Sequence, residues 1–375
     1  MHYFICAGEP SGDLHAAGLI EAIKKDDQQA RFTFLGGDLM ASAAGTSPVI
    51  HYSRMAFMGF SEVLRNLRTI SANIKVAKKA LADSRPDCFI AVDYPSFNLK
   101  LAAHAVKLGI PVYWYISPKV WAWKEYRVKS LRKYVRKMLC ILPFEVEFYR
   151  KHGMEAIYVG NPTLEEIDER LAKAPSKEAF CREKGLDPSR PVLALVPGSR
   201  RGEIKNNLPV MAQVAALHPD LQPVIAGAPG RSGEDYAVAS GIPVLYGCTF
   251  DIMAIAEAAL VTSGTATLEC ALARTPQVVC YRANASRLSY NLMKMILKIP
   301  FVSLPNLIAG KRVIAEMLVH LCTVDGVDAE LNAILPGHSG RRDMLDGYEL
   351  IRQKLGEHGA AARAAAVITT DLSQQ

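Results

Sequence analysis

Four short segments of this chain carry polar side chains that suit phosphate binding or proton transfer. The first, SGTATLE at 263–269, follows an apolar run and places small residues and hydroxyls at a predicted helix start. Amides at the start of a helix bind phosphate, because they carry the positive end of the helix dipole. We interpret the segment as a nucleotide-diphosphate site in which Glu269 accepts from a ribose diol; the alternative is a simple helix cap. The candidate residues are Ser263, Gly264, Thr265, Thr267 and Glu269.

The second segment, PGSRRGEI at 197–204, has the same order of an apolar strand followed by a turn. Arginine offers a fork of N–H donors that suits the oxyanions of a departing diphosphate. Ser199 and Arg200 are the candidate residues here. The alternative is a surface turn with solvated arginines.

The third segment, DYPSFN at 93–98, ends a buried strand at Asp93. A carboxylate in this place is a candidate general base for a hydroxyl nucleophile. Its ordinary pKa of ~3.9 is low for that role, so its surroundings would have to raise it. Alternatively, Asp93 only organises the turn before Pro95.

The fourth segment, GEPSGD at 8–13, is a polar turn before a helix, with Ser11 as its predicted cap. It lacks the third glycine of a dinucleotide-binding loop and the Lys-Ser/Thr pair of a Walker loop. Glu9, Ser11 and Gly12 are candidate residues for the acceptor side of a site.

Each segment follows a predicted strand, and strands alternate with helical patterns along the chain. This alternation predicts an α/β fold of two doubly wound, Rossmann-like domains that face a cleft. Ligands of such sheets collect beyond the carboxyl ends of the strands. We expect an N-terminal domain at 1–162, a second domain at 163–340, and a helical tail at 341–375 that packs back on the first. The strands before the four segments are Tyr3–Ala7, Cys88–Val92, Val192–Val196 and Ala259–Thr262.

The composition supports a globular chain, because half of its 375 residues are hydrophobic and 22% are charged. The net charge of +7 favours anionic partners. The eight cysteines form no CxxC pair and suggest reduced core residues, while the nine histidines show no metal-binding spacing, so no metal site is expected. The chain begins with a strand-like run, so we expect no signal peptide, and no apolar stretch is long enough for a spanning helix.

A basic, partly aromatic segment at 55–80 predicts contact with a lipid surface. Its apolar residues fall on one helical face, with lysines and arginines among and beyond them. Such a helix can bury its apolar face among acyl chains while its cations meet anionic headgroups; the alternative is an ordinary core-facing stripe. The Lys- and Arg-rich run at 124–137 could serve the same surface or an acceptor phosphate. The predicted contact residues are Phe57, Phe60, Leu64 and Leu67, with Ile74 on the same face.

Taken together, these segments resemble the lipid-A-disaccharide synthase family of glycosyltransferases, which have the GT-B fold. The resemblance covers nearly the whole chain. Its motifs are, in order, GEPSGD, MGFSEVL, DYPSFN, ISPKVWAWKEYR, LPFEVEFY, VGNP, PGSR with EI, SGTATLE and SLPNLIAG.

The resemblance implies an enzyme that transfers 2,3-diacylglucosamine from its UDP donor to the 6-hydroxyl of 2,3-diacylglucosamine 1-phosphate. It implies Asp93 as the catalytic base and adds Asn306 to the residues around UDP. It further implies no metal or other cofactor, a cytoplasmic protein held on the inner face of the inner membrane by anionic phospholipid, and allows a homodimer. The sequence departs from the usual pattern at Ser96, Asn161, Ala315 and His320, which bears on fine substrate detail.

Two other functions remain open from the residues. One is an epimerase of UDP-N-acetylglucosamine with the same fold, which would need no lipid-facing surface. The other is a nucleic-acid-binding protein that uses the run at 124–137, although no recognition helix, RNP motif or zinc finger accompanies it. We therefore expect no nucleic acid among the partners.

Overall fold

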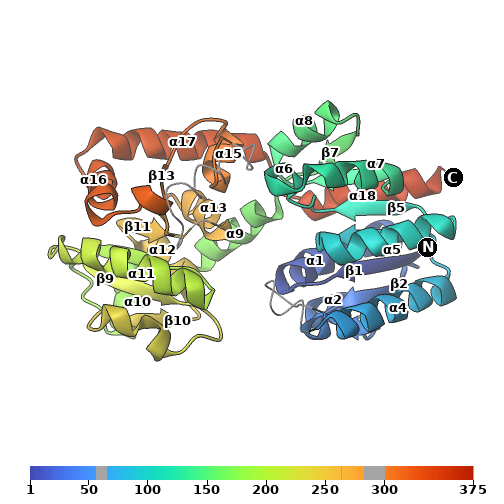
Figure 1. The fold of residues 1–375 in the computed structure, drawn as a ribbon, viewed down its shortest axis with the longest axis horizontal. Helices are drawn as coiled ribbons and strands as arrows, with labels where there is room; N and C mark the ends of the chain where they lie inside the picture. Colours follow the sequence, from blue (N-terminus) through green and yellow to red (C-terminus); the bar gives the residue numbers. More distant parts are fainter. Residues whose placement is uncertain (56–65, 263, 283–299, 375) are drawn as a thin grey trace. The chain divides into compact units, whose positions relative to one another are not determined.

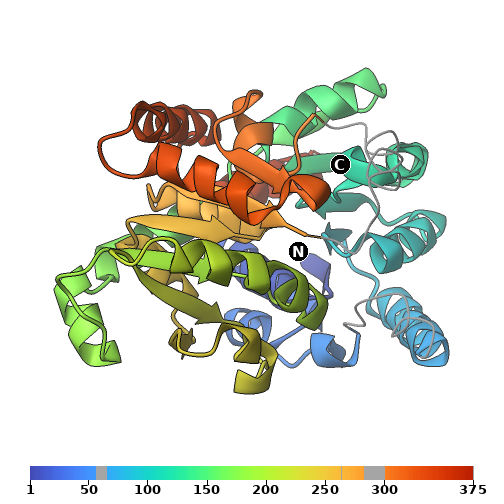
Figure 2. The same ribbon diagram turned by 60° about the vertical axis from the view of Figure 1, so that its left-hand side comes forward.

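The structure of the protein is a computed structural model that describes residues 1–55, 66–262, 264–282 and 300–374. The chain forms two compact units, one made of Met1–Pro162 with Glu357–Gln375 and the other of Thr163–Gly356. Each unit is a parallel sheet with helices on both faces (Figure 1, Figure 2). The doubly wound α/β fold predicted from the sequence is confirmed.

The first unit contains a seven-stranded sheet of order β3-β2-β1-β4-β5-β6-β7. Its central strands are buried on both faces, which explains why they read as continuous apolar runs such as CFIAV in β4. The strands are β1 His2–Ala7, β2 Arg31–Gly36, β3 Ile50–His51, β4 Cys88–Val92, β5 Val112–Tyr115, β6 Lys137–Cys140 and β7 Ala156–Tyr158.

Two hydrophobic cores lie on the two faces of this sheet, because successive strand side chains point to opposite sides. The helices are α1 Pro10–Asp26, α2 Asp38–Ala44, α4 Leu67–Ser84, α5 Pro95–Lys107, α6 Val120–Trp123, α7 Val128–Tyr134, α8 Pro143–Lys151 and α18 Ala360–Ser373. Phe4 and Cys6 belong to the core under α4, α5 and α7, while Tyr3 and Ile5 belong to the core under α1 and α18.

The second unit contains a six-stranded sheet of order β10-β9-β8-β11-β12-β13. Its strands are β8 Val192–Val196, β9 Gln222–Gly227, β10 Val244–Tyr246, β11 Ala258–Val261, β12 Gln277–Tyr281 and β13 Ala315–Leu318. Its helices are α9 Pro162–Lys173, α10 Lys177–Lys184, α11 Arg201–Ala216, α12 Thr249–Ile255, α13 Thr265–Leu272, α15 Leu304–Ala309, α16 Val324–Ile334 and α17 Ser339–Leu355.

The C-terminal helices belong to different units. Of the tail expected at 341–375, α17 packs within the second unit, and the chain passes to the first unit after Gly356. There α18 packs against α1, and its small Ala364 and Ala365 are fully buried. The hydroxyl of Tyr113 in β5 donates to the Asp371 carboxylate at 2.6 Å, which fixes the end of α18 to the sheet.

Candidate functional site

The four predicted segments follow strands that form two adjacent pairs. In the first unit β1 lies beside β4, with Ala7 opposite Val92 at their carboxyl ends. In the second unit β8 lies beside β11, with Val196 opposite Val261. In each sheet the strand order reverses between these two strands, which is where open α/β sheets bind ligands. The structure therefore brings GEPSGD together with DYPSFN, and PGSR together with the turn at 264–269.

Asp93 directly follows β4 in a backbone conformation that few residues adopt. The φ angles of Asp93 and Tyr94 are 41° and 48°, in the left-handed region. Such residues, when they are not glycine, cost about 1–3 kcal/mol each and cluster at functional sites. Two consecutive strained residues therefore mark this strand end as a specialised turn.

The surroundings of Asp93 change its acidity in the direction that a general base needs. Burial raises the pKa of the Asp93 carboxyl to about 6, Lys119 opposes this rise, and Glu9 adds to it. A base works best when its pKa lies near the operating pH. The charge of Glu9 thus connects GEPSGD to Asp93 electrostatically.

Asn98 holds this strained turn in place and was not singled out from the sequence. It is fully buried on α5, and its Nδ2 donates to the carbonyls of Asp93 at 2.8 Å, Cys6 at 3.2 Å and Val92 at 3.3 Å. One side chain therefore joins the carboxyl ends of β1 and β4. A polar residue within the apolar face of PSFNLKLAA was the only signal available in the sequence.

The GEPSGD turn divides into residues that pack and residues that are accessible. A Cβ atom on Gly8 would lie 2.3 Å from the Tyr94 ring, and one on Gly12 would lie 3.3 Å from the Ala7 Cβ. Both glycines therefore allow close packing against neighbouring segments, and the predicted acceptor-side role of Gly12 stays a prediction. Ser11 is exposed, but the N-cap position belongs to Glu9, so the predicted Ser11 cap is wrong.

Asp13, the last residue of this motif, also has a structural role that the sequence did not reveal. Its buried carboxylate accepts from the backbone N–H groups of Gly37 at 2.6 Å, Leu39 at 3.1 Å and Met40 at 3.2 Å. A carboxylate at a helix start complements the helix dipole. Asp13 therefore caps α2 from α1.

The turn at 264–269 separates exposed donors from a buried hydroxyl. Gly264 and Thr265 are exposed at the start of α13, and a Cβ on Gly264 would meet open space. Thr267 is fully buried and its hydroxyl donates to the Gly264 carbonyl at 2.7 Å. Thr267 therefore stabilises the turn from its buried side, and its predicted contact with UDP stays a prediction. Ser263 lies outside the described residues.

Glu269 lies one turn into α13 and is partly buried. Burial raises the pKa of its carboxyl, the Arg170 guanidinium lowers it, and Glu166 raises it. Arg170 also covers the Phe250 ring at 4.3 Å from its centre. The helix α9 thus supplies a cation close to Glu269, which sequence spacing alone did not indicate.

The PGSR turn is organised by the carboxylate of Glu203, a role that sequence spacing alone did not indicate. Oε2 of Glu203 accepts from the backbone N–H groups of Ser199 and Arg200, both at 3.1 Å, and its Oε1 accepts from the Arg200 guanidinium at 3.0 Å. Gly198 has a φ of 110°, and a Cβ there would lie 2.6 Å from the Glu203 carboxylate. The predicted diphosphate donors are therefore satisfied by an internal anion, and a diphosphate would compete with it.

A second buried asparagine joins the strand ends of this unit. Asn207 of α11 donates from Nδ2 to the Thr262 hydroxyl at 2.9 Å and the Pro197 carbonyl at 3.3 Å, and its Oδ1 accepts from the Arg282 N–H at 2.7 Å. It ties the ends of β8, β11 and β12 together, as Asn98 ties β1 and β4.

Asn306 is buried, and its side-chain amide is hydrogen-bonded within the protein. Its Nδ2 donates to the Ile314 carbonyl and the Glu316 carboxylate, and its Oδ1 accepts from the N–H groups of Val313 and Ile314. A side-chain amide has two donor hydrogens and two acceptor positions, and here all four are filled. The buried Asn306 therefore braces the loop between α15 and β13, and its predicted contact with a nucleotide stays a prediction.

The predicted lipid-facing residues lie largely outside the described residues. Phe57, Phe60 and Leu64 belong to that part, and Leu67 is described only as the first residue of α4. Ile74, expected on the same face, is buried in the core with residues of β4 and α5, so this part of the prediction is wrong. Within the described part of the chain, no helix is long and apolar enough to cross a membrane.

The cysteines lie where the sequence predicts them. All eight cysteines are described, and each is buried and free, as predicted for core residues. Among residues 1–55, 66–262, 264–282 and 300–374, no group of three or more His, Cys, Asp or Glu side chains is arranged to hold a metal ion.

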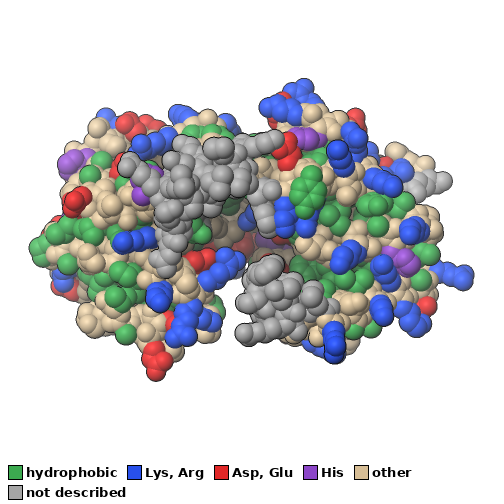
Figure 3. Space-filling model, in the orientation of Figure 1, with side chains coloured by type: hydrophobic (Ala, Val, Ile, Leu, Met, Phe, Trp, Pro, Cys, Tyr) green, Lys and Arg blue, Asp and Glu red, His purple; other side chains and the backbone are tan. Residues whose placement is uncertain are grey.

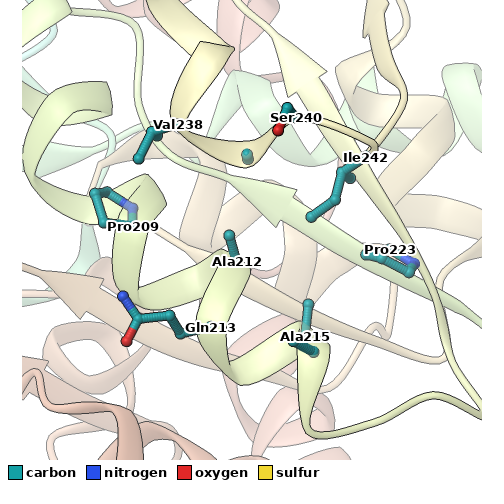
Figure 4. Close-up of a pocket in the computed structure, with 10 residues that line it drawn as sticks. Pro209, Ala212, Gln213, Ala215, Pro223, Val238, Ser240 and Ile242 are labelled. Carbon is teal, nitrogen blue, oxygen red and sulfur yellow. The ribbon is translucent and has the colours of Figure 1, made fainter.

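A separate pocket of about 370 Å³ lies between α11, β9 and the 3-10 helix Gly233–Ala239 (Figure 4). Its lining includes Pro209, Ala212, Val238 and Ile242, and contains none of the predicted site residues. The pocket is mostly apolar and has no charged lining residue, so it does not suit a diphosphate.

Solved structures with the same fold include sugar-transferring and sugar-modifying enzymes. The calicheamicin glycosyltransferase matches with a TM-score of 0.60 at 16% identity, covering 100% of this chain and 98% of that chain. A UDP-GlcNAc 2-epimerase from Neisseria meningitidis bound to UDP-GlcNAc matches with a TM-score of 0.62 at 14% identity, covering 100% of both chains. At these identities the likeness concerns the fold alone. That fold is GT-B, and it places the protein in the structural class shared by these enzymes.

Sequence relatives are more specific. The family model for lipid-A-disaccharide synthetase matches residues 3–369. The lipid-A-disaccharide synthase of Myxococcus xanthus is 40% identical over 96% of this chain and 95% of its own length, and that of Syntrophus aciditrophicus is 38% identical over 98% and 96%. The chain belongs to the lipid-A-disaccharide synthase family and is a glycosyltransferase of lipid A biosynthesis.

Proposed function

We propose that this enzyme transfers 2,3-diacylglucosamine from its UDP donor to the 6-hydroxyl of 2,3-diacylglucosamine 1-phosphate, with inversion at the anomeric carbon. The first unit binds the acceptor and the second binds the UDP-sugar. The family membership supports the reaction type, and the two switch-point loop pairs support this division of roles.

In the acceptor half, Asp93 is the general base. Its carboxylate takes the proton of the 6-hydroxyl while the hydroxyl oxygen forms a bond to the anomeric carbon of the donor sugar. The bond from that carbon to the diphosphate oxygen breaks, and UDP leaves with the electron pair. Attack from the face opposite the leaving group gives the β-1,6 linkage.

In the donor half, charge on the departing diphosphate is stabilised by N–H donors at the start of α13 and by Arg200. Exposed Gly264 and Thr265 leave room for phosphate oxygens beside amides that have no partner within the helix. Preorganised donors of this kind are a large source of transition-state stabilisation. Glu269 accepts from the ribose hydroxyls. The structure of S. aureus MnaA with UDP has the same fold, with a TM-score of 0.65 at 12% identity, so it supports only the use of this fold for UDP.

The observation that carries the proposal is Asp93, a strained strand-end carboxylate whose pKa is raised to about 6 at a topological switch point. The test is to incubate the purified protein with both acylated sugars and to identify the product by mass spectrometry. The proposal requires a disaccharide 1-phosphate and stoichiometric UDP. Conversion of UDP-N-acetylglucosamine alone to an epimer, with no disaccharide, would establish the epimerase alternative.

The lipid substrates also require access to a membrane surface, and a basic helical layer supports this. Helices α4, α5 and α7 lie side by side on one face of the first sheet. They expose Val76, Val106 and Leu108 among Lys and Arg side chains, and Figure 3 shows basic and hydrophobic groups interspersed over this region.

Basic groups near anionic lipid contribute about 1 kcal/mol each. We propose that this layer faces anionic phospholipid on the inner face of the inner membrane. Its exposed cations are Arg68, Lys75, Lys79, Lys100, Lys107, Lys129, Arg132 and Lys133.

A further inference from the structure

A buried carboxylate lies beneath the segment 117–123, and the proposed reaction assigns it no role. Glu145 of α8 is 1% exposed. Its Oε1 accepts from the indole N–H of Trp121 at 3.1 Å, and its Oε2 accepts from the backbone N–H of Leu142 at 3.1 Å. Two residues of α8 thus hold this segment, because the hydroxyl of Tyr149 also lies 2.9 Å from the Ser117 hydroxyl.

The contacts of Glu145 suit the ionised carboxylate and not the neutral acid. Both of its oxygens accept from N–H groups, and a carboxylic acid would place a hydrogen where one of these donors points. Burial opposes ionisation, and the balance raises the pKa of Glu145 to about 7. The other titratable groups that face it are Cys140 of β6, Tyr149 of α8 and Tyr158 of β7, whose pKa values are all raised, mainly by burial, so they are neutral at pH 7.

The segment held by this network carries a cation that acts on the proposed base. The Trp121 ring packs edge-on against Phe144, with 5.0 Å between ring centres, and Trp121 is 9% exposed. Between the two anchored residues, Ser117 and Trp121, lies the exposed Lys119, whose charge lowers the pKa of Asp93. The position of Lys119 relative to Asp93 therefore depends on anchors in α8.

We propose that Glu145 is a positioning residue for glycosyl transfer, which acts through the Trp121 N–H to hold Lys119 beside Asp93. This inference rests on the proposed function of Asp93. Protonation of Glu145 weakens its hold on the indole N–H and loosens the segment. Asp93 then loses a nearby cation that favours its ionised, proton-accepting form, so turnover falls. The network thereby couples the ionisation of a residue outside the site to the placement of a charge within it.

The test compares wild type with Glu145→Gln over a range of pH. The amide has nearly the same shape but only one acceptor atom, so it cannot accept from both the Trp121 and the Leu142 N–H groups, and in this respect it imitates the protonated acid. We expect kcat at pH 8 to fall about ten-fold or more, as misplacement near a reacting centre does. The ratio of wild-type to variant kcat should decline toward one as the pH falls below 7. A purely structural role would leave this ratio independent of pH.

Glu147→Gln, an exposed change on the same helix, is the matched control and should leave kcat at its wild-type value.

Trp121→Phe keeps an aromatic side chain, although a smaller one, and removes the donor, so it tests the same contact if Glu145→Gln folds poorly. We expect it to reproduce the loss of kcat at a temperature where the variant is fully folded. Glu145→Gln should add little in a Lys119→Met background, because both changes act on one interaction. A flat ratio across pH, or wild-type kcat in Trp121→Phe, would overturn the inference while leaving the proposed function intact. A wild-type protein that makes no disaccharide would instead overturn the proposed function, and this inference with it.

Discussion

The Nδ2 atom of Asn98 lies 2.8 Å from the backbone carbonyl oxygen of Asp93 and donates a hydrogen bond to it. The same amide reaches the carbonyl of Cys6 on the neighbouring strand. A strained residue persists only where its surroundings over-determine its conformation. Asn98 supplies that constraint for Asp93, so the geometry of the proposed base depends on a side chain that does not react.

Replacing Asn98 by alanine should therefore affect both stability and turnover. The carbonyls of Asp93, Val92 and Cys6 lose their shared donor in a buried place, which we expect to cost about 1–3 kcal/mol. The turn should also relax, lowering kcat by about 10- to 100-fold while the affinity for UDP is retained. Chemical denaturation and steady-state kinetics measure the two effects.

Asn207→Ala is the matched control for this change, because Asn207 is equally buried and joins strand ends in the second unit. It should weaken UDP binding. A kcat equal to wild type in Asn98→Ala, at a temperature where the variant is folded, would contradict the positioning role.

Asp93→Asn should abolish turnover and leave UDP binding unchanged, because the amide cannot accept the proton of the acceptor hydroxyl. In wild type, the activity should fall as the pH decreases through about 6, where Asp93 becomes protonated. Calorimetric titration with UDP and a pH–rate profile measure these outcomes. Turnover within a few fold of wild type would exclude Asp93 as the base.

The same substitution should stabilise the protein at neutral pH. Because the folded-state pKa of Asp93 lies above its ordinary value, the folded state binds the proton more tightly than the unfolded state. The contribution of this group to stability is therefore full below pH ~4 and is lost as the pH rises through about 6. At pH 8, Asp93→Asn should raise the free energy of unfolding by on the order of 1–3 kcal/mol, with a smaller gain at pH 4.

The alternation of apolar runs and helical patterns was sufficient to predict the fold, because parallel strands buried on both faces and their covering helices have distinct periodicities. It also placed Asp93, Arg200 and Thr265 at strand ends. The sequence could not show which strands are neighbours, so the pairing of the segments had to come from the sheet order. The sequence pattern also predicted α17 and α18 as one tail. It could not show that the chain changes unit after Gly356, because that change depends on tertiary packing.

Within the site, hydroxyl and amide side chains were the least predictable. Thr267 and Asn306 have the residue types of ligand-binding groups, yet the hydroxyl of one and the amide of the other are bonded within the protein. Asn98, Asn207 and Glu203 have no distinctive spacing, because their partners are backbone atoms brought near by folding. Sequence patterns identify exposed strand ends but not the buried groups that brace them.

Glu269→Ala should weaken UDP binding by roughly ten-fold, since one or two ribose hydrogen bonds to a charged acceptor contribute about 1.5–3 kcal/mol. Thr267→Val in the same turn is the comparison, because its hydroxyl bonds only within the turn. It should lower stability by about 1 kcal/mol and change UDP affinity much less. If isothermal titration gives equal affinity for wild type and Glu269→Ala, the segment serves as a helix start without a ribose contact.

Asn306→Ala should behave as a change in stability. Four hydrogen bonds disappear with the side chain, and two backbone N–H groups and one carbonyl lose a buried partner. We expect a loss of about 2 kcal/mol or more in the free energy of unfolding. Any loss of UDP affinity should be recovered when the protein is assayed well below its melting temperature. An undiminished free energy of unfolding combined with lost UDP affinity would restore Asn306 as a ligand.

Removing positive charge from α4 and α5 should detach the protein from anionic lipid. The variant Lys75→Gln, Lys79→Gln, Lys100→Gln and Lys107→Gln changes only exposed side chains. At about 1 kcal/mol for each basic group, partitioning onto phosphatidylglycerol vesicles should fall by on the order of 100-fold or more. Wild-type binding should itself weaken as salt shortens the range of the attraction.

Sedimentation with phosphatidylglycerol and with phosphatidylcholine vesicles measures the difference in lipid binding between the variant and wild type. The charge-matched comparison removes four exposed cations of the second unit, by Lys173→Gln, Arg182→Gln, Lys205→Gln and Lys311→Gln, and should bind nearly as wild type does. Equal sedimentation of both variants would assign lipid binding to another surface.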